Sequence, residues 1–137
     1  MEHYETFSTT ADVGVYISGN NYSELYNSAI KGLNLLYFDQ LLDTQETVTK
    51  TAFHYEGDSL ENILVNLLSE VFYLIQYERK YISGITINKA DDHLLDGLLH
   101  VSELDREPGI EIKSVTYHNL HVLKENNTLS TGIIFDV

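Results

Sequence analysis

The feature that most constrains the fold is a long apolar stripe between Ser59 and Arg79. Its apolar side chains recur at intervals of three and four residues, which puts them on one side of an α-helix; they are Leu60, Ile63, Leu64, Leu67, Leu68, Val71, Phe72 and Ile75. A stripe this wide is typical of a face buried in a protein core rather than of a ligand site. Asp58 and Glu61 at the start, and Arg79 with Lys80 at the end, suit the two ends of a helix. The sequence therefore predicts a helix over residues 59–79 that packs against a second layer of structure.

A second helix is predicted over residues 22–37. Its apolar side chains also recur at helical spacing, at Leu25, Ala29, Leu33 and Leu36. Asn21 and Glu24 stand three residues apart at its start, which is the spacing of a capping box with Asn at the cap.

Most of the remaining chain carries strand patterns. Val13, Val15 and Ile17 alternate with smaller or polar residues, and later stretches are rich in β-branched and aromatic residues. Strands are predicted over residues 13–18, 48–55, 81–88, 94–103, 110–124 and 129–137. Residues 90–92 and 125–127 are predicted to be hairpin turns.

Helices embedded among mostly antiparallel strands predict an α+β fold, with the two main helices packed on one face of the sheet. The chain of 137 residues has no internal repeat or low-complexity linker, and its only proline, Pro108, lies in a loop-like stretch. A single domain over residues 1–137 is expected, because this length suits one domain with a sizeable core.

The charge balance limits the possible partners. Eight Lys and Arg residues stand against 21 Asp and Glu residues, and the formal net charge is −13. Such a surface repels phosphate backbones, so direct binding of nucleic acid is not expected. A basic protein partner or cations held by carboxylates fit better, although acidity that only keeps the protein soluble is an open alternative. The absence of cysteine excludes disulfides and thiolate metal sites.

The chain carries no sign of export or membrane insertion. Its first residues, Met1 to Glu5, lack the basic and apolar regions of a signal peptide. No apolar run approaches the roughly 20 residues that span a bilayer. We therefore expect a soluble, cytoplasmic protein that does not bind membranes.

Familiar catalytic motifs are absent: there is no phosphate-binding glycine loop, no cysteine nucleophile and no Gly-x-Ser-x-Gly elbow. His118 and His121 stand three residues apart, a spacing that would share one face of a helix. The predicted strand over 110–124 sends them to opposite faces instead, so chelation of a metal by this pair is not expected.

Two aspartates at strand ends are stronger candidates for a site. Asp12 stands where an early strand begins, and Asp136 is the last residue but one of an apolar strand. If the strand holds that end in place, the α-carboxylate of Val137 lies close to Asp136. Three carboxylates suit a hard cation such as Ca²⁺ or Mg²⁺. The alternative is that Asp12 caps a turn and Asp136 is solvated.

Five segments in order along the chain resemble the archease family. The clearest are residues 10–14 (Thr-Ala-Asp-Val-Gly), residues 111–118 (Glu-Ile-Lys-Ser-Val-Thr-Tyr-His) and residues 134–137 (Ile-Phe-Asp-Val). Residues 57–60, which open the long helix, and residues 32–39 fall at matching points. Each segment alone is a weak signal, but the ordered set spans nearly the whole chain.

The chain departs from the family pattern at three places. The family usually has a histidine before its Thr-Ala-Asp motif, where this chain has Thr9. An Asp-Trp pair of the long helix is replaced by Asn66 and Leu67, and the threonine at the end of the first helix is replaced by Phe38. The two aspartates are kept, whereas the contribution of the histidine is in doubt.

The resemblance implies a function that composition alone does not. Archease-like proteins activate RtcB-type RNA-splicing ligases, which join RNA ends through a nucleotide attached to a ligase histidine, and they promote that guanylylation and multiple turnover. It implies an accessory protein rather than an enzyme, which meets RNA only through the ligase. It also implies a divalent ion, Ca²⁺ or Mg²⁺ or Mn²⁺, bound by Asp12, Asp136 and the carboxylate of Val137. Contacts to the ligase or a nucleotide are then implied for Lys113, Tyr117, His118 and Asp39.

Two other classes of function stay open. The acidic surface is also compatible with a general chaperone or interaction module. A hydrolase using a metal held by Asp12 and Asp136 is less favoured, because no base or nucleophile stands in a recognisable motif.

Overall fold

The computed structural model describes residues 1–43 and 48–137, which form two antiparallel sheets and two helices. The larger sheet has the strand order β1-β2-β8-β6, with β7 also paired to β8; its strands are β1 (His3–Ser8), β2 (Val13–Gly19), β6 (Ser114–Val115), β7 (Leu123–Glu125) and β8 (Thr128–Asp136). The smaller sheet has the order β3-β5-β4, formed by β3 (Thr49–Glu56), β4 (Lys80–Asp91) and β5 (Leu94–Glu103). The helices are α1 (Tyr22–Phe38) and α2 (Leu60–Gln76).

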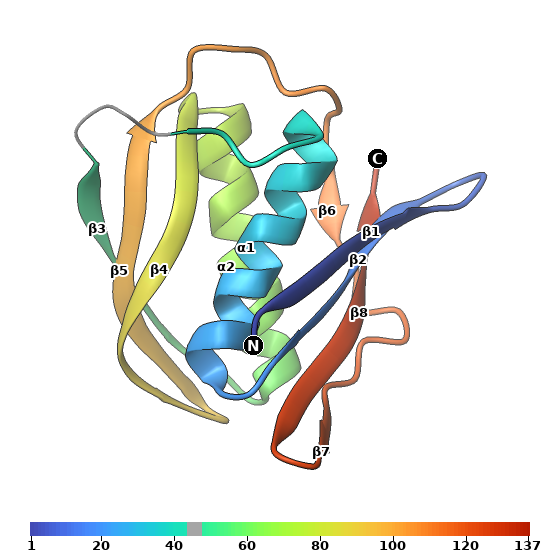
Figure 1. The fold of residues 1–137 in the computed structure, drawn as a ribbon, viewed down its shortest axis with the longest axis vertical. Coiled ribbons are helices and arrows are strands. Elements are labelled where there is room, and N and C mark those ends of the chain that lie inside the picture. Colours follow the sequence, from blue (N-terminus) through green and yellow to red (C-terminus); the bar gives the residue numbers. More distant parts are fainter. Residues whose placement is uncertain (44–47) are drawn as a thin grey trace.

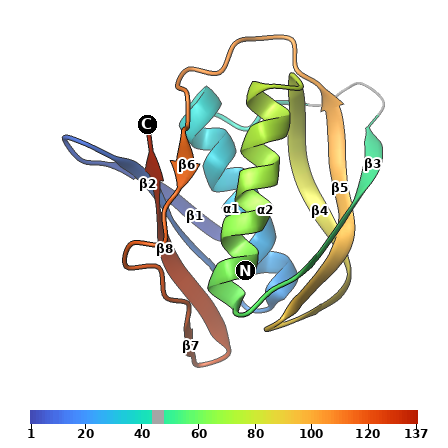
Figure 2. The ribbon, with the colours of Figure 1, turned by 180° about the vertical axis from the view of Figure 1, so that it is seen from behind.

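The two helices lie between the two sheets (Figure 1). Helix α1 packs against β1 and β2 on one side and β4 on the other, and α2 contacts β3, β4 and β6. Figure 2 shows the same layers from behind. Each sheet therefore buries only the face that meets the helices. The predicted α+β class with mostly antiparallel strands is confirmed, and the division of the strands into two sheets is what the sequence did not indicate.

Helix α1 follows its predicted bounds closely. The Asn21 side chain accepts a hydrogen bond from the Glu24 N–H at 2.8 Å, as the capping-box spacing predicted. The helix ends at Asp39, whose backbone is left-handed at φ 60° and whose N–H donates to the Leu35 carbonyl oxygen at 2.9 Å.

Helix α2 is confirmed, but both of its ends differ from the prediction. Ser59, rather than Asp58, is the cap and accepts from the Asn62 N–H at 3.1 Å. The helix ends at Gln76 instead of Arg79, because the chain turns from Tyr77 onward and Arg79, with a left-handed backbone at φ 58°, leads directly into β4.

Five of the predicted strands are confirmed to within a few residues, as β2, β3, β4, β5 and β8. The turn predicted at 125–127 is also confirmed: Asn126 and Asn127 both have positive φ, at 51° and 62°, as a two-residue type I′ hairpin requires. The turn predicted at 90–92 is formed by Asp92 and His93 instead, because β4 continues through Asp91.

The strand predicted over 110–124 is wrong, and β1 was not predicted. In place of one strand the chain forms the short strands β6 and β7, separated by an irregular segment, residues 116–122. Asn119 interrupts that segment with φ 56°, and the Leu120 N–H closes a turn onto the Tyr117 carbonyl oxygen at 3.1 Å. On the helix-facing side of β1, Tyr4 is partly buried while Thr6 and Ser8 are exposed, which is too little apolar pattern for a sequence-based prediction.

A side chain replaces a strand partner next to β6. The Gln76 amide accepts from the Ile112 N–H at 2.6 Å and donates to the Ile112 carbonyl oxygen at 3.0 Å. The Tyr37 hydroxyl donates to the same Gln76 side chain at 2.5 Å. Ile112 is buried, so these bonds satisfy backbone groups that water does not reach. They hold the start of β6 against the ends of both helices.

Candidate functional site

Strand pairing brings the two candidate aspartates to one end of the larger sheet. Strand β8 lies between β2 and β6, with Phe135 paired to both Val13 and Val115. One step further along the same strands, Asp136 pairs with Ser114, and the register puts Asp12 opposite Asp136 on the other side. We call Asp12, Asp136 and Ser114 the carboxylate row. Because Phe135 faces the core, the alternation of side chains turns this row to the outer face.

Thr9 organises the turn that carries Asp12. Its hydroxyl oxygen accepts hydrogen bonds from the N–H groups of Ala11 and Asp12, at 3.4 Å and 3.1 Å. Its own N–H donates to the Asp12 carbonyl oxygen at 2.9 Å. The residue that stands in place of the family histidine therefore fixes the backbone of the hairpin loop, and this leaves the Asp12 carboxylate free of that task.

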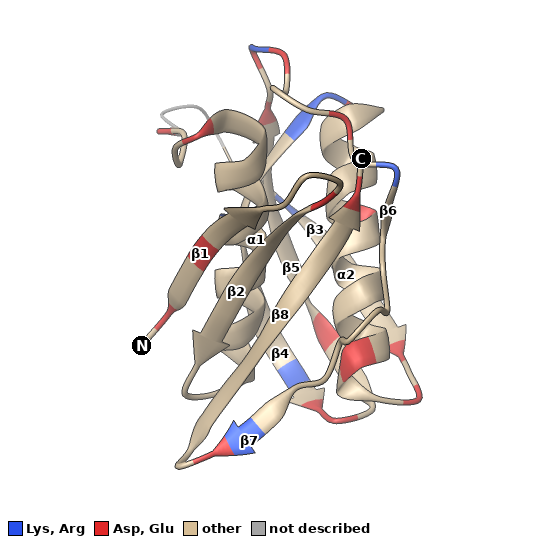
Figure 3. Cartoon of the chain, turned by 90° about the vertical axis from the view of Figure 1, so that its right-hand side faces the viewer, with Lys and Arg blue, Asp and Glu red and all other residues tan. Residues whose placement is uncertain are grey.

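The backbone of Lys113 is joined to the same end of the sheet. Its N–H donates to the Asp136 carbonyl oxygen at 2.8 Å, so Lys113 lies beside Asp136 and Val137. Figure 3 shows acidic segments at the β1–β2 hairpin and at the end of β8, both near the C-terminus. Asp39 is the C-cap of α1, and no hydrogen bond among the described residues joins it to Asp12, Lys113 or Asp136. Strand pairing and this backbone bond bring Asp12, Lys113, Asp136 and Val137 to one end of the sheet, whereas Asp39 belongs to neither contact.

The carboxylate row offers oxygen donors without competing partners. No described residue gives the side chains of Asp12, Asp136 or Lys113 a hydrogen bond or ion pair. Neighbouring strands lie about 4.8 Å apart, so both carboxylates are within reach of one cation. Without a cation, the two carboxylates repel each other by about 1 kcal/mol in water.

The carboxylate row contains only two acidic side chains, those of Asp12 and Asp136. Within residues 1–43 and 48–137, no three His, Asp or Glu side chains are close enough together to hold a metal ion. A cation at the carboxylate row therefore needs further oxygens, from the main chain, the α-carboxylate of Val137 or water. The donor chemistry fits a hard, partly hydrated ion.

Tyr117 and His118 lie in the irregular segment 116–122 and not on a strand. Helix α2 anchors this segment: the Asn62 amide donates to the Tyr117 hydroxyl at 2.9 Å, and the Glu61 carboxylate accepts from the Val122 N–H at 2.7 Å. His118 and His121 both line one groove, so the prediction that they point to opposite faces is wrong. The reason is that the segment lacks the strand alternation on which that prediction rested.

The groove has a volume of about 560 Å³ and lies on the outer face of the larger sheet. Phe7 lies over Gly14, where a Cβ atom would be only 2.2 Å from the Phe7 ring. Tyr16 lies over Gly132 in the same way, with 3.1 Å to its ring. The two rings stack on each other with centroids 4.5 Å apart. We call this feature the aromatic groove. The aromatic groove was not predicted from the sequence, although glycines inside strands are a known sign of close approach.

The fold and the carboxylate row define a small two-sheet α+β protein with oxygen donors exposed at one sheet end. The model of the Archease protein family (MTH1598/TM1083) matches residues 4–137. The chain belongs to the archease family, as the resemblance of its motifs predicted.

Its relatives match over nearly their whole length. Protein archease of Thermoplasma acidophilum is 36% identical over 141 residues, covering 98% of this chain and 93% of the relative. Protein archease of Thermoplasma volcanium is 32% identical over 139 residues, covering 98% of both.

Two solved structures are similar to this one. The solution structure of protein 1598 of Methanobacterium thermoautotrophicum has a TM-score of 0.69 at 22% identity over 98% of both chains, and shows the fold. The crystal structure of an archease from Thermotoga maritima, described as a possible chaperone, has a TM-score of 0.65 at 25% identity over 97% of this chain and 96% of that one.

Neither α1 nor α2 is long and apolar enough to cross a membrane.

Proposed function

We propose that this protein activates an RtcB-type RNA-splicing ligase, promoting guanylylation of the ligase and its multiple turnover. In this role it is an accessory protein, and it meets RNA only through the ligase. The observation that carries the proposal is the meeting of Asp12, Lys113 and Asp136, from three separate archease motifs, at one end of one sheet.

The carboxylate row is proposed to hold one divalent cation, Ca²⁺ or Mg²⁺ or Mn²⁺, through Asp12, Asp136 and the α-carboxylate of Val137. When bound, the ion supplies positive charge that can face a phosphate group. Asp12 is positioned by the Thr9 turn, and Asp136 by its place between β2 and β6. Neither carboxylate has a hydrogen bond or ion pair to a described residue, so each can turn toward the ion without breaking such a contact.

Lys113 is proposed to contact an anionic group of the ligase or of its nucleotide. Its ammonium has no ion pair among the described residues, although the chain has 21 acidic residues and only 8 Lys and Arg residues. The backbone bond to Asp136 fixes where the Lys113 side chain starts. His118 lines the aromatic groove, and Tyr117 precedes it in the same irregular segment. Both are proposed to contact the ligase rather than the cation.

A ligation assay tests this function directly. The cognate RtcB-type ligase is supplied with GTP, a divalent metal and RNA ends in large excess, with and without this protein. Activation predicts faster ligation over many turnovers, while the protein alone converts no RNA. Unchanged turnover, with both proteins shown to be folded, would refute the proposal.

A general chaperone is the second candidate, because the Thermotoga maritima relative is described as a possible chaperone. The two functions differ in their range of partners. A chaperone suppresses the aggregation of unrelated proteins, whereas a dedicated activator leaves their aggregation unchanged and accelerates only the ligase.

A further inference from the structure

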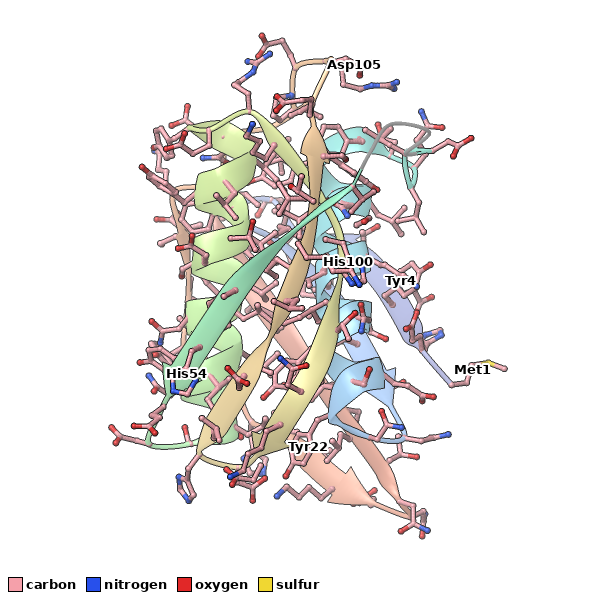
Figure 4. The ribbon with its side chains drawn as sticks, turned by 90° about the vertical axis from the view of Figure 1, so that its left-hand side faces the viewer. Met1, Tyr4, Tyr22, His54, His100 and Asp105 are labelled. Atoms are coloured by element: carbon pink, nitrogen blue, oxygen red, sulfur yellow. The ribbon has the colours of Figure 1, made fainter. Side chains whose placement is uncertain are left out.

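The outer faces of the two sheets differ in charge. On the exposed side of the smaller sheet, Asp96 lies between His54 and Lys89, and Lys50 lies opposite His100; Figure 4 shows both histidines there. On the larger sheet, no Lys, Arg, Asp or Glu side chain lines the aromatic groove within the part of the chain that is described. A protein with a net charge of −13 thus keeps this groove free of carboxylates, although His3, His118 and His121 line it.

The aromatic groove is continuous with the carboxylate row on the same outer face. Pairing across the sheet puts Phe7, Gly14 and Ile134 in the next row, about 6.6 Å along the strands. Tyr16 and Gly132 occupy the row after that. Whatever approaches the carboxylate row from this side therefore meets the aromatic rings as well.

The groove is formed in advance of any binding. The two rings lie flat because the glycines beneath them have no side chains. The segment 116–122 forms one wall, and its hydrogen bonds to Glu61 and Asn62 tie that wall to helix α2. Because the ordering is already present, a partner that binds here loses less conformational entropy.

Its composition is that of the centre of a protein interface. Interface cores are depleted of charged residues and enriched in aromatic ones, and exposed tyrosines are frequent sites of high binding energy. Tyr16 is 54% exposed and Leu123 at the groove edge is 48% exposed. Around them lie acidic side chains: Asp12 and Asp136 at one end and Glu5 beside β2.

We infer that the aromatic groove is the surface through which this protein docks on the ligase, so that the carboxylate row is aimed at the ligase's reacting nucleotide. This inference rests on the proposed function. The charge pattern specifies the partner surface: an apolar or aromatic projection that enters the groove, ringed by Lys and Arg side chains that face the acidic rim. Docking and activation are thereby assigned to adjacent rows of one sheet face.

Truncation of exposed rings tests the docking surface. Tyr16→Ala removes the exposed ring of the groove, and Leu123→Ala trims its edge. Tyr77→Ala is the matched control, because Tyr77 is 63% exposed at the end of α2, outside the groove. Affinity for the cognate ligase is measured by calorimetric titration, and folding of each variant is checked by circular dichroism.

We expect Tyr16→Ala to weaken ligase binding at least about tenfold, Leu123→Ala to weaken it less, and Tyr77→Ala to bind as the parent does. If folded Tyr16→Ala and Leu123→Ala both bind like the parent, the docking surface is overturned while the proposed function stands. If the parent itself neither binds nor activates the ligase, the proposed function and the docking surface fail together.

Discussion

Adjacent residues of β8 should respond very differently to truncation, because they face opposite sides of the sheet. Phe135 is fully buried between the larger sheet and the helices, whereas Ile134 lies half-buried on the outer face. Removing a buried Phe ring costs about 3–5 kcal/mol in unfolding free energy, from lost transfer energy and the cavity left behind. Truncating a half-buried Ile removes about three methyl or methylene groups that were only partly shielded, which costs about 1 kcal/mol.

Urea unfolding followed by far-ultraviolet circular dichroism measures both values. Phe135→Ala should lower the transition midpoint strongly, and Ile134→Ala slightly, with the same denaturant slope in each case. The first loss is a large part of a typical total stability of about 5–15 kcal/mol. Equal losses for the two variants, or a larger loss for Ile134→Ala, would show that β8 does not present the faces described here. The conclusion that the Asp136 side chain points away from the core would then be wrong as well.

Three further predictions concern the site and the far end of the molecule. Lys113→Ala should reduce activation in the ligation assay while changing stability by no more than about 0.5 kcal/mol; undiminished activation would return Lys113 to an ordinary surface role. A short extension after Val137 should weaken binding of Ca²⁺, Mg²⁺ and Mn²⁺ in calorimetric titration, with Asp12→Asn and Asp136→Asn as side-chain comparisons; normal binding by the extended form would exclude the α-carboxylate as a ligand. Burial, together with the hydrogen bond to Asp92, raises the pKa of Tyr22 from 10.0 to about 12, so stability tied to the protonated phenol is present below pH 10 and lost as pH rises through 12. Tyr22→Phe should therefore lose less stability than the parent across that window, and identical losses would contradict the assigned interaction.

The Tyr22 site joins parts of the chain that are distant in sequence. The Tyr22 hydroxyl donates to Asp92 at 2.5 Å, and the Lys124 ammonium donates to the same carboxylate at 2.5 Å. These bonds connect α1, the β4–β5 hairpin and β7, at the end of the molecule where Figure 4 labels Tyr22. The Lys124 hydrogen bond holds the pKa of Asp92 below its usual range.

The helices and hairpins could be predicted from the sequence because their signals are local. The apolar stripe of α2 and the Asn21 cap of α1 depend on residues within a few positions of each other. Asn126 and Asn127 likewise specify their own turn by accepting positive φ angles.

What could not be predicted depends on contacts between distant segments. Ile112 looks like a strand residue, yet its backbone is satisfied by Gln76 from another element. Residues 116–122 look like a continuation of that strand, but the groups that hold them, Glu61 and Asn62, stand more than fifty positions earlier. The hydrophobic pattern of a short stretch of sequence does not indicate a hydrogen-bond partner so far away in the chain.

The candidate site could be predicted only in part, because one of its two features depends on contacts between distant segments. Asp12 and Asp136 could be singled out because strand ends and family motifs mark them, and the register brings them together. The aromatic groove could not, because stacking of Phe7 on Tyr16 requires β1, which the sequence did not indicate.

Gly14 and Gly132, which lie under the aromatic rings, limit the substitutions that this sequence can accept. No described glycine has a positive φ, so these two are needed for space and not for backbone conformation. At position 132 an added methyl group would meet only the ring of Tyr16, whereas at position 14 it would also meet the backbone oxygen of Ile133 at 2.5 Å. Residues 16 and 132 can therefore exchange volume and should covary among relatives, a large side chain at one accompanying glycine at the other. Position 14 has no such freedom, and a smaller residue at position 7 would not release it.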